Sequence, residues 1–172
     1  MNSNDLKLNQ IQVIGSHNSY RIHPVQDMFN LMTGLNPELA AELDYGHPSF
    51  DVQFSQHGIR QIEIDVYHDP EGGLFYNQRG NLFIGLPVPS GIEELLDPGL
   101  KVLHFPDIDY RTHYLTFIDA LTAVKTWSDA NPNHIPIFIL VEAKEDGLAN
   151  VYPSLSGFTQ PLPFDRDALD AI

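Results

Sequence analysis

Hydrophobic and polar residues alternate most regularly in segment 59–67. In an extended chain, successive side chains point to opposite faces, so Ile62 and Ile64 lie on one face and Glu63 and Asp65 on the other. This pattern predicts a strand that places two carboxylates on the same side.

Three further apolar runs predict strands. Segment 11–15 ends in a glycine before polar turn residues, and segment 101–105 follows a Pro-Gly pair. Segment 135–141 is almost continuously apolar, which is typical of a strand buried on both faces of a parallel sheet. We expect these segments to form one sheet with the strand at 59–67.

Helix signals lie between these strands. Asn36 is a predicted N-cap because Pro37 and an acidic first turn follow it. Thr112 is predicted to cap a longer helix whose apolar residues recur at helical spacing. The remaining expected features are a short helix at 51–56, an irregular connection at 80–91, a helix end at 131–133 and a capped helix at 165–172.

The alternation of strands and helices predicts a parallel α/β architecture, either an open doubly wound sheet or a barrel. A complete eight-unit barrel needs about 250 residues. The chain has 172 residues, enough for roughly four such units. We therefore expect residues 1–172 to form a single domain that is truncated at its carboxyl end.

Composition and charge limit the classes of binding partner that the chain can have. The chain has 9 Lys and Arg against 23 Asp and Glu, a net charge of -14, and its cations are scattered. Nucleic acid is therefore excluded as a partner, and any peripheral contact with an anionic membrane would need a divalent cation. The sequence has no cysteine, which excludes disulfides and thiolate metal sites.

The sequence leaves the compartment open. It shows neither a basic and apolar leader at its start nor an apolar run long enough to span a membrane. We expect a soluble protein, and a secreted or periplasmic location is compatible with this expectation.

Candidate chemical groups lie where the predicted strands end, which is where parallel α/β folds bind ligands. The residues at these positions are His17, Asn18, Glu63, Asp65, His104, Glu142 and Lys144.

The acidic residues of this set favour a site for a hard cation. Two carboxylates on one side of a strand repel each other unless a cation lies between them. Glu142 follows a predicted buried strand and needs a partner, while Asn18 can add an amide oxygen. Each residue also has an alternative to cation binding. Glu63 and Asp65 could form a solvated acidic face on an edge strand, Glu142 could form an ion pair with Lys144, and Asn18 could have only a turn-forming role.

His17 and His104 are candidate acid–base residues because each ends a predicted strand and imidazoles titrate near neutral pH. His68, close to Asp65, is a reserve candidate for the role of His104. We expect surface roles for the other histidines, which are His23, His47, His57, His113 and His134.

Four motifs in this order resemble the calcium-dependent phosphoinositide-specific phospholipase C family. They are IGSHNSY at 14–20, GIRQIEIDVY at 58–67, LHFPD at 103–107 and LVE at 140–142. The resemblance extends from about Leu8 to the end of the chain. It implies a phosphodiesterase TIM (β/α)8 barrel, of which this chain would hold only the amino-terminal, catalytic half.

The resemblance also implies residue roles. The calcium ligands, with magnesium as an alternative ion, would be Asn18, Glu63, Asp65 and Glu142. His17 and His104 would be the catalytic histidines, either Glu63 or Asp65 would accept a proton, and Lys144 would bind the substrate phosphate. One departure is the longer spacing between Asp65 and His104, caused by the loop from Glu71 to Gly99.

The implied activity is hydrolysis of a phospholipid or small phosphodiester, with the inositol 2-hydroxyl attacking phosphorus to give a cyclic phosphate. The alternatives are a glycerophosphodiester phosphodiesterase of the same barrel, a non-catalytic metal-stabilised binding module and an open-sheet domain with another ligand. The chain would pair with a missing carboxyl-terminal half or with another copy in its place.

Overall fold

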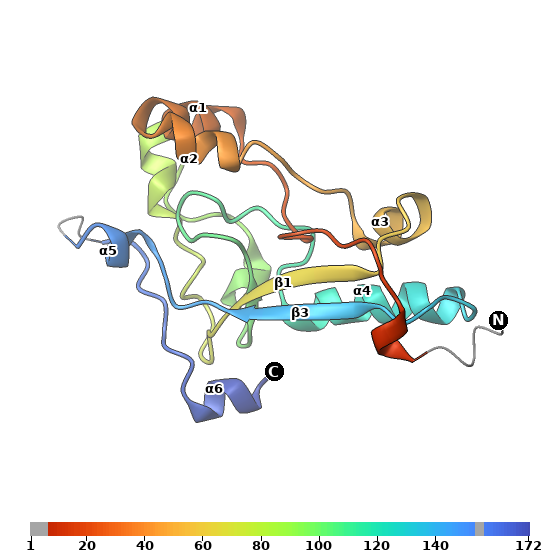
Figure 1. The fold of residues 1–172 in the computed structure, drawn as a ribbon. Helices are drawn as coiled ribbons and strands as arrows, with labels where there is room; N and C mark the ends of the chain where they lie inside the picture. The colour runs from red at the N-terminus through yellow and green to blue at the C-terminus, as the bar shows by residue number, and fades with distance from the viewer. Residues whose placement is uncertain (1–6, 154–156) are drawn as a thin grey trace.

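The centre of the fold is a three-stranded mixed sheet with the strand order β2-β1-β3. Figure 1 labels two of these strands, β1 and β3, which lie side by side. The computed structural model describes residues 7–153 and 157–172. Strand β1 (Gln61–Tyr67) pairs in parallel with β3 (Phe138–Ala143) and antiparallel with β2 (Lys101–Val102). The described chain is therefore a mixed α/β protein, and this sheet is not a closed barrel.

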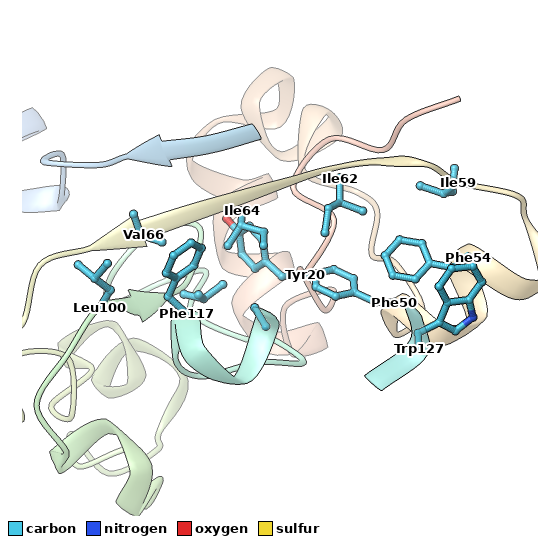
Figure 2. Packing of buried hydrophobic residues seen from close by; sticks show 12 residues of the cluster. Tyr20, Phe50, Phe54, Ile59, Ile62, Ile64, Val66, Leu100, Phe117 and Trp127 are labelled. Carbon is cyan, nitrogen blue, oxygen red and sulfur yellow. The ribbon is translucent and has the colours of Figure 1, made fainter. Parts of the chain in front are cut away.

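The main core lies between β1 and two helices, α3 (Phe50–Gln56) and α4 (Phe117–Ala130) (Figure 2). Ile62, Ile64 and Val66 are fully buried on the face of β1 that contacts these helices. The alternation predicted for this segment is confirmed. Because the apolar residues occupy the core face, Glu63 and Asp65 project from the opposite face.

The helices on the periphery follow their local signals. Asn36 caps α2, and Asp165 caps α6, each through a side-chain oxygen that accepts a backbone N–H of the first turn. The helix beginning at residue 26 was not predicted. The remaining elements are α1 (Gln26–Leu35), α2 (Pro37–Glu42), α5 (Leu148–Val151), α6 (Arg166–Asp170) and the 3-10 helices η2 (Leu8–Gln10), η3 (Arg79–Ile84) and η4 (Glu93–Leu96).

Two local predictions were wrong. Segment 11–15 is not a full strand, because only Gly15 forms a bridge with Gln61 at the start of β1. The longer helix is capped by Thr116 instead of Thr112. The hydroxyl of Thr112 donates to the carbonyl of Tyr114, which holds that segment in an extended loop.

Two strand predictions were also wrong in their details. Segment 101–105 forms only the two-residue β2, which runs antiparallel to β1, so the sheet is not purely parallel. Strand β3 is not buried on both faces, since Leu140 is 54% exposed. The reason is its place at the edge of the described sheet, where β1 is its neighbour.

Among the described residues, no helix combines the length and apolarity needed to cross a membrane.

Candidate metal and acid–base site

The sheet register brings three carboxylates together. Asp65 on β1 is the direct partner of Glu142 on the parallel strand β3, and Glu63 lies two residues earlier on the same face of β1. One carboxylate oxygen from each of the three residues lies within 4.8 Å of the others. The strand is central and Glu63 and Asp65 are buried, which contradicts the alternative of an edge strand with a solvated acidic face.

Asp65 is the most buried member of this acidic cluster, which consists of Glu63, Asp65 and Glu142. Its side chain is 0% exposed, and neither of its carboxylate oxygens has a hydrogen-bond partner among the described residues. Burial raises the pKa of this carboxyl, while the Lys144 ammonium acts in the opposite direction. A buried charge without hydrogen bonds is costly, so the site favours a cation at this position.

Lys144 supplies part of the counter-charge. Its Nζ lies 3.4 Å from Oδ2 of Asp65 and 4.0 Å from Oε1 of Glu142. The ion pair between Glu142 and Lys144 that the sequence left open is therefore present, together with the carboxylate cluster. A lysine in this position also lies within reach of a ligand held by the three acids.

The loop after residue 15 places Asn18 beside the cluster. The N–H of Ser19 donates to the carbonyl of Glu63 (3.1 Å), and the hydroxyl of Ser19 accepts the N–H of Glu63 (2.9 Å). Asn18 is buried with φ 49°, a left-handed conformation that asparagine tolerates better than most residues. Its Nδ2 donates to the Tyr45 hydroxyl (2.9 Å) and its Oδ1 accepts from the Tyr20 hydroxyl (3.4 Å).

His17 lies at the exposed edge of the same cluster. Its side chain is 70% exposed, and Nε2 lies 3.8 Å from Oε1 of Glu63. On the other side of the ring, the Tyr45 hydroxyl lies 3.2 Å from Nδ1. His17 also lines an open pocket of about 610 Å³, together with Tyr45, His47 and other residues of the loops before β1. A substrate in this pocket would lie next to the imidazole.

His104 approaches the cluster from the segment after β2. Its side chain is 17% exposed, and its Nδ1 lies 2.7 Å from Oδ2 of Asp109. Burial raises the pKa of Asp65, and Lys144 and, to a smaller extent, His104 act against this rise. His68, the reserve candidate, instead packs its ring 6.0 Å from that of Phe164.

Three residues that support the site were not identified from the sequence. Asp109 contacts His104, Tyr45 connects His17 with Asn18, and the buried Arg21 contacts both Asp109 and Tyr45. Their separation along the chain reaches 88 residues, so no local pattern marks them. The one available signal was the acidic content of the loop after His104.

The expectation of a plain surface role does not fit His47 either. Its Nε2 lies 2.8 Å from the carbonyl oxygen of His17, and burial lowers its pKa. Among the other histidines, His23 Nε2 lies 3.1 Å from Oδ1 of Asp44, and His113 Nε2 lies 2.8 Å from the carbonyl oxygen of His47.

The donor set fits a hard divalent cation. Three carboxylates and a neighbouring amide provide oxygen ligands only, which Ca²⁺ and Mg²⁺ prefer. The buried oxygens of Asp65 have no hydrogen-bond partner among the described residues. The fold and site thus define a mixed α/β protein with a candidate cation centre and the His17 imidazole at its edge.

Comparison with known proteins identifies the family. The family model for Ca²⁺-dependent phosphoinositide phospholipase C matches residues 6–172, so the chain belongs to this family. The suspected resemblance is thereby confirmed, and the acidic cluster agrees with the calcium dependence of the family. Searches of curated proteins and of solved structures gave no match.

Proposed function

We propose that this chain is a Ca²⁺-dependent phospholipase C-type enzyme that cleaves phosphoinositide-type phosphodiesters. The observation that carries the proposal is the convergence of Glu63, Asp65 and Glu142 within 4.8 Å, with His17 only 3.8 Å from Glu63. The parallel pairing of β1 and β3, with its acidic residues in register, also supports a phosphodiesterase barrel as the parent architecture.

The acidic cluster and Asn18 would hold the ion. Bound there, Ca²⁺ would supply electrostatic stabilisation of the negative charge that develops on the phosphoryl oxygens and the attacking hydroxyl. Asn18 suits this role because its Nδ2 donates to Tyr45, while Oδ1, which accepts one hydrogen bond from Tyr20, has a second lone pair for the cation.

The chain's own side chains would then move protons and bind the phosphate. Glu63 or Asp65 accepts the proton of the inositol 2-hydroxyl, which attacks phosphorus. His17 donates a hydrogen bond to the phosphoryl oxygens, and His104 protonates the departing diacylglycerol oxygen, so that a cyclic phosphate is released. Lys144, next to Asp65, binds a substrate phosphate.

The high negative charge affects how such an enzyme meets its substrate. With a net charge of -14, the chain is repelled by an anionic lipid surface, so contact with lipid is peripheral and favoured by Ca²⁺.

The test is calcium-dependent release of inositol phosphate from phosphatidylinositol by the protein and by a His17→Ala variant. We expect the variant to lose about 10²–10⁴ in rate, while its thermal unfolding stays close to wild type because His17 is 70% exposed. His134→Ala is the control, since His134 lies outside both the acidic cluster and the pocket that His17 lines.

The products separate the alternatives. A cyclic inositol phosphate supports the proposal, whereas attack by water that leaves the phosphate on the glycerol indicates a glycerophosphodiester phosphodiesterase. Calcium-dependent stabilisation without turnover indicates a binding module. Wild-type turnover in His17→Ala would exclude the mechanism.

A further inference from the structure

A tight turn after β2 brings a carboxylate next to His104. The backbones of Phe105 and Asp109 exchange two hydrogen bonds of 3.0 Å each. Between them, Asp107 has φ 71°, in the left-handed region, and its carboxylate accepts the N–H groups of Arg79 (2.7 Å) and Thr159 (2.9 Å). Segments distant in the sequence therefore hold the turn in one conformation.

The carboxylate of Asp109 lies between His104 and the buried Arg21 and contacts both side chains. Its Oδ2 accepts from Nε of Arg21 (2.7 Å) and lies 2.7 Å from Nδ1 of His104. Arg21 and Asp109 are both 0% exposed. In this dry environment the hydrogen bonds are stronger than in water, and removing one partner is costly.

Arg21 is itself fixed by other parts of the chain. Its guanidinium donates to the carbonyls of Leu43 (2.9 Å) and Tyr45, and it lies over the Tyr45 ring at 4.7 Å. These bonds leave the guanidinium little freedom to leave Asp109. The same arginine thus contacts the supports of both candidate catalytic histidines, because the Tyr45 hydroxyl also contacts His17.

His104 is held from a second side through its backbone. The Tyr67 hydroxyl lies within hydrogen-bonding distance of the His104 carbonyl (3.3 Å) and also donates to the carbonyl of Asp146 (2.9 Å). Both the main chain and the Nδ1 side of the ring are therefore fixed. Among the described residues, Nε2 of His104 makes no hydrogen bond, so it is the ring nitrogen left for chemistry.

We infer that Asp109, oriented by the buried Arg21, is a positioning residue that keeps the proton of His104 on Nδ1 and directs Nε2 toward the substrate. The inference rests on the proposed function, in which His104 is the general acid. In that step Nε2 gives its proton to the oxygen that leaves phosphorus, while the Nδ1 proton remains on the ring and bonded to Asp109. The carboxylate acts on the substrate only through the imidazole.

The first test needs no enzymatic activity. ¹⁵N-edited NMR of the wild-type histidine side chains reports which ring nitrogen of His104 carries hydrogen, with the His104 signals assigned from a His104→Gln variant. We expect a proton on Nδ1 at neutral pH, shielded from exchange with water. A neutral His104 with its proton on Nε2 would overturn the inference, whether or not the protein is an active phospholipase.

The second test uses two substrates that differ in their leaving group. Asp109→Asn should lower turnover of phosphatidylinositol by about 10²-fold, the lower end of a general-acid contribution. Turnover of myo-inositol 1-(4-nitrophenyl phosphate) should stay close to wild type, because nitrophenolate departs without a proton. KM should change little in both cases, since Asp109 is fully buried and does not contact the substrate.

Asp69→Asn is the matched control. Asp69 is another buried carboxylate, paired with the buried Lys101 at 3.3 Å, but it does not contact an imidazole. We expect it to lose stability without changing the ratio of the two turnover rates. An equal loss on both substrates in Asp109→Asn would show a merely structural role, whereas wild-type protein inactive on both would contradict the proposed function instead.

Discussion

Replacing Asp65 with asparagine tests the cation centre most directly. Asp65 is fully buried, its oxygens have no hydrogen-bond partners among the described residues, and burial raises its pKa. Without a cation, the folded protein bears the cost of a poorly solvated carboxylate. We therefore expect the metal-free Asp65→Asn variant to be no less stable than metal-free wild type.

Added calcium should make the wild type more stable than the Asp65→Asn variant. A ligand that binds only the folded state at 100 times its Kd adds about 2.7 kcal/mol to the free energy of unfolding. For a chain of this length, that gain raises Tm by roughly 5–10 °C. We expect the wild type to show this shift in thermal unfolding followed by circular dichroism, and Asp65→Asn to lose most of it.

Asp69→Asn again provides the control, because Asp69 pairs with Lys101 at 3.3 Å as Asp65 pairs with Lys144 at 3.4 Å. Lys144 is 16% exposed and keeps Glu142 at 4.0 Å when Asp65 is replaced, whereas Lys101 is 0% exposed. Loss of Asp69 therefore leaves a buried ammonium without its counter-charge and should cost about 3–5 kcal/mol. The calcium-induced shift of this variant should nevertheless equal that of wild type. A full calcium shift in Asp65→Asn would refute the assignment of the site.

Two further predictions concern the surroundings of the site. A Cβ on Gly80 would lie 2.1 Å from the carbonyl oxygen of Asp107, so Gly80→Ala should lower the free energy of unfolding in urea by about 1–3 kcal/mol. Gly34→Ala, in open space on α1, should raise it slightly, and equal effects would contradict the close packing. Burial lowers the pKa of His47 in the folded state, so the unfolded chain takes up its proton first as pH falls. The contribution of His47 to the unfolding free energy should therefore be highest above about pH 6.5 and decrease toward its lowered pKa. His47→Gln should reduce this slope, and an unchanged slope in this variant would count against the prediction.

Local patterns predicted the parts of the fold that depend on neighbouring residues. The alternation around Ile64 located β1, and the Asn36-Pro37 pair located the start of α2, because side-chain direction and capping are decided within a few residues. Thr112 and Thr116 are both suitable caps, and only the tertiary hydrogen bonds of the loop selected Thr116.

The candidate site was partly accessible from the sequence. Two carboxylates on one side of β1 and a third on β3 converge as expected, because neighbouring parallel strands bring residues near their carboxyl ends to the same edge of a sheet. The direction of β2 was predicted wrongly, since a two-residue strand has too little pattern to define its partner's orientation. The hydrogen bond from Arg21 to Asp109 joins residues that are 88 positions apart, and the periodicity of the sequence does not predict such a contact.

The sequence by itself determined which residue types stand at the strand ends, the acidic character of the site and the family to which the chain belongs. Only the tertiary structure decided that Asp65 is dry, that Lys144 lies against it, and that Asp109 holds His104. The physical reason is that the sequence gives the type of each side chain directly, whereas burial and long-range pairing arise only when distant segments pack together and exclude water.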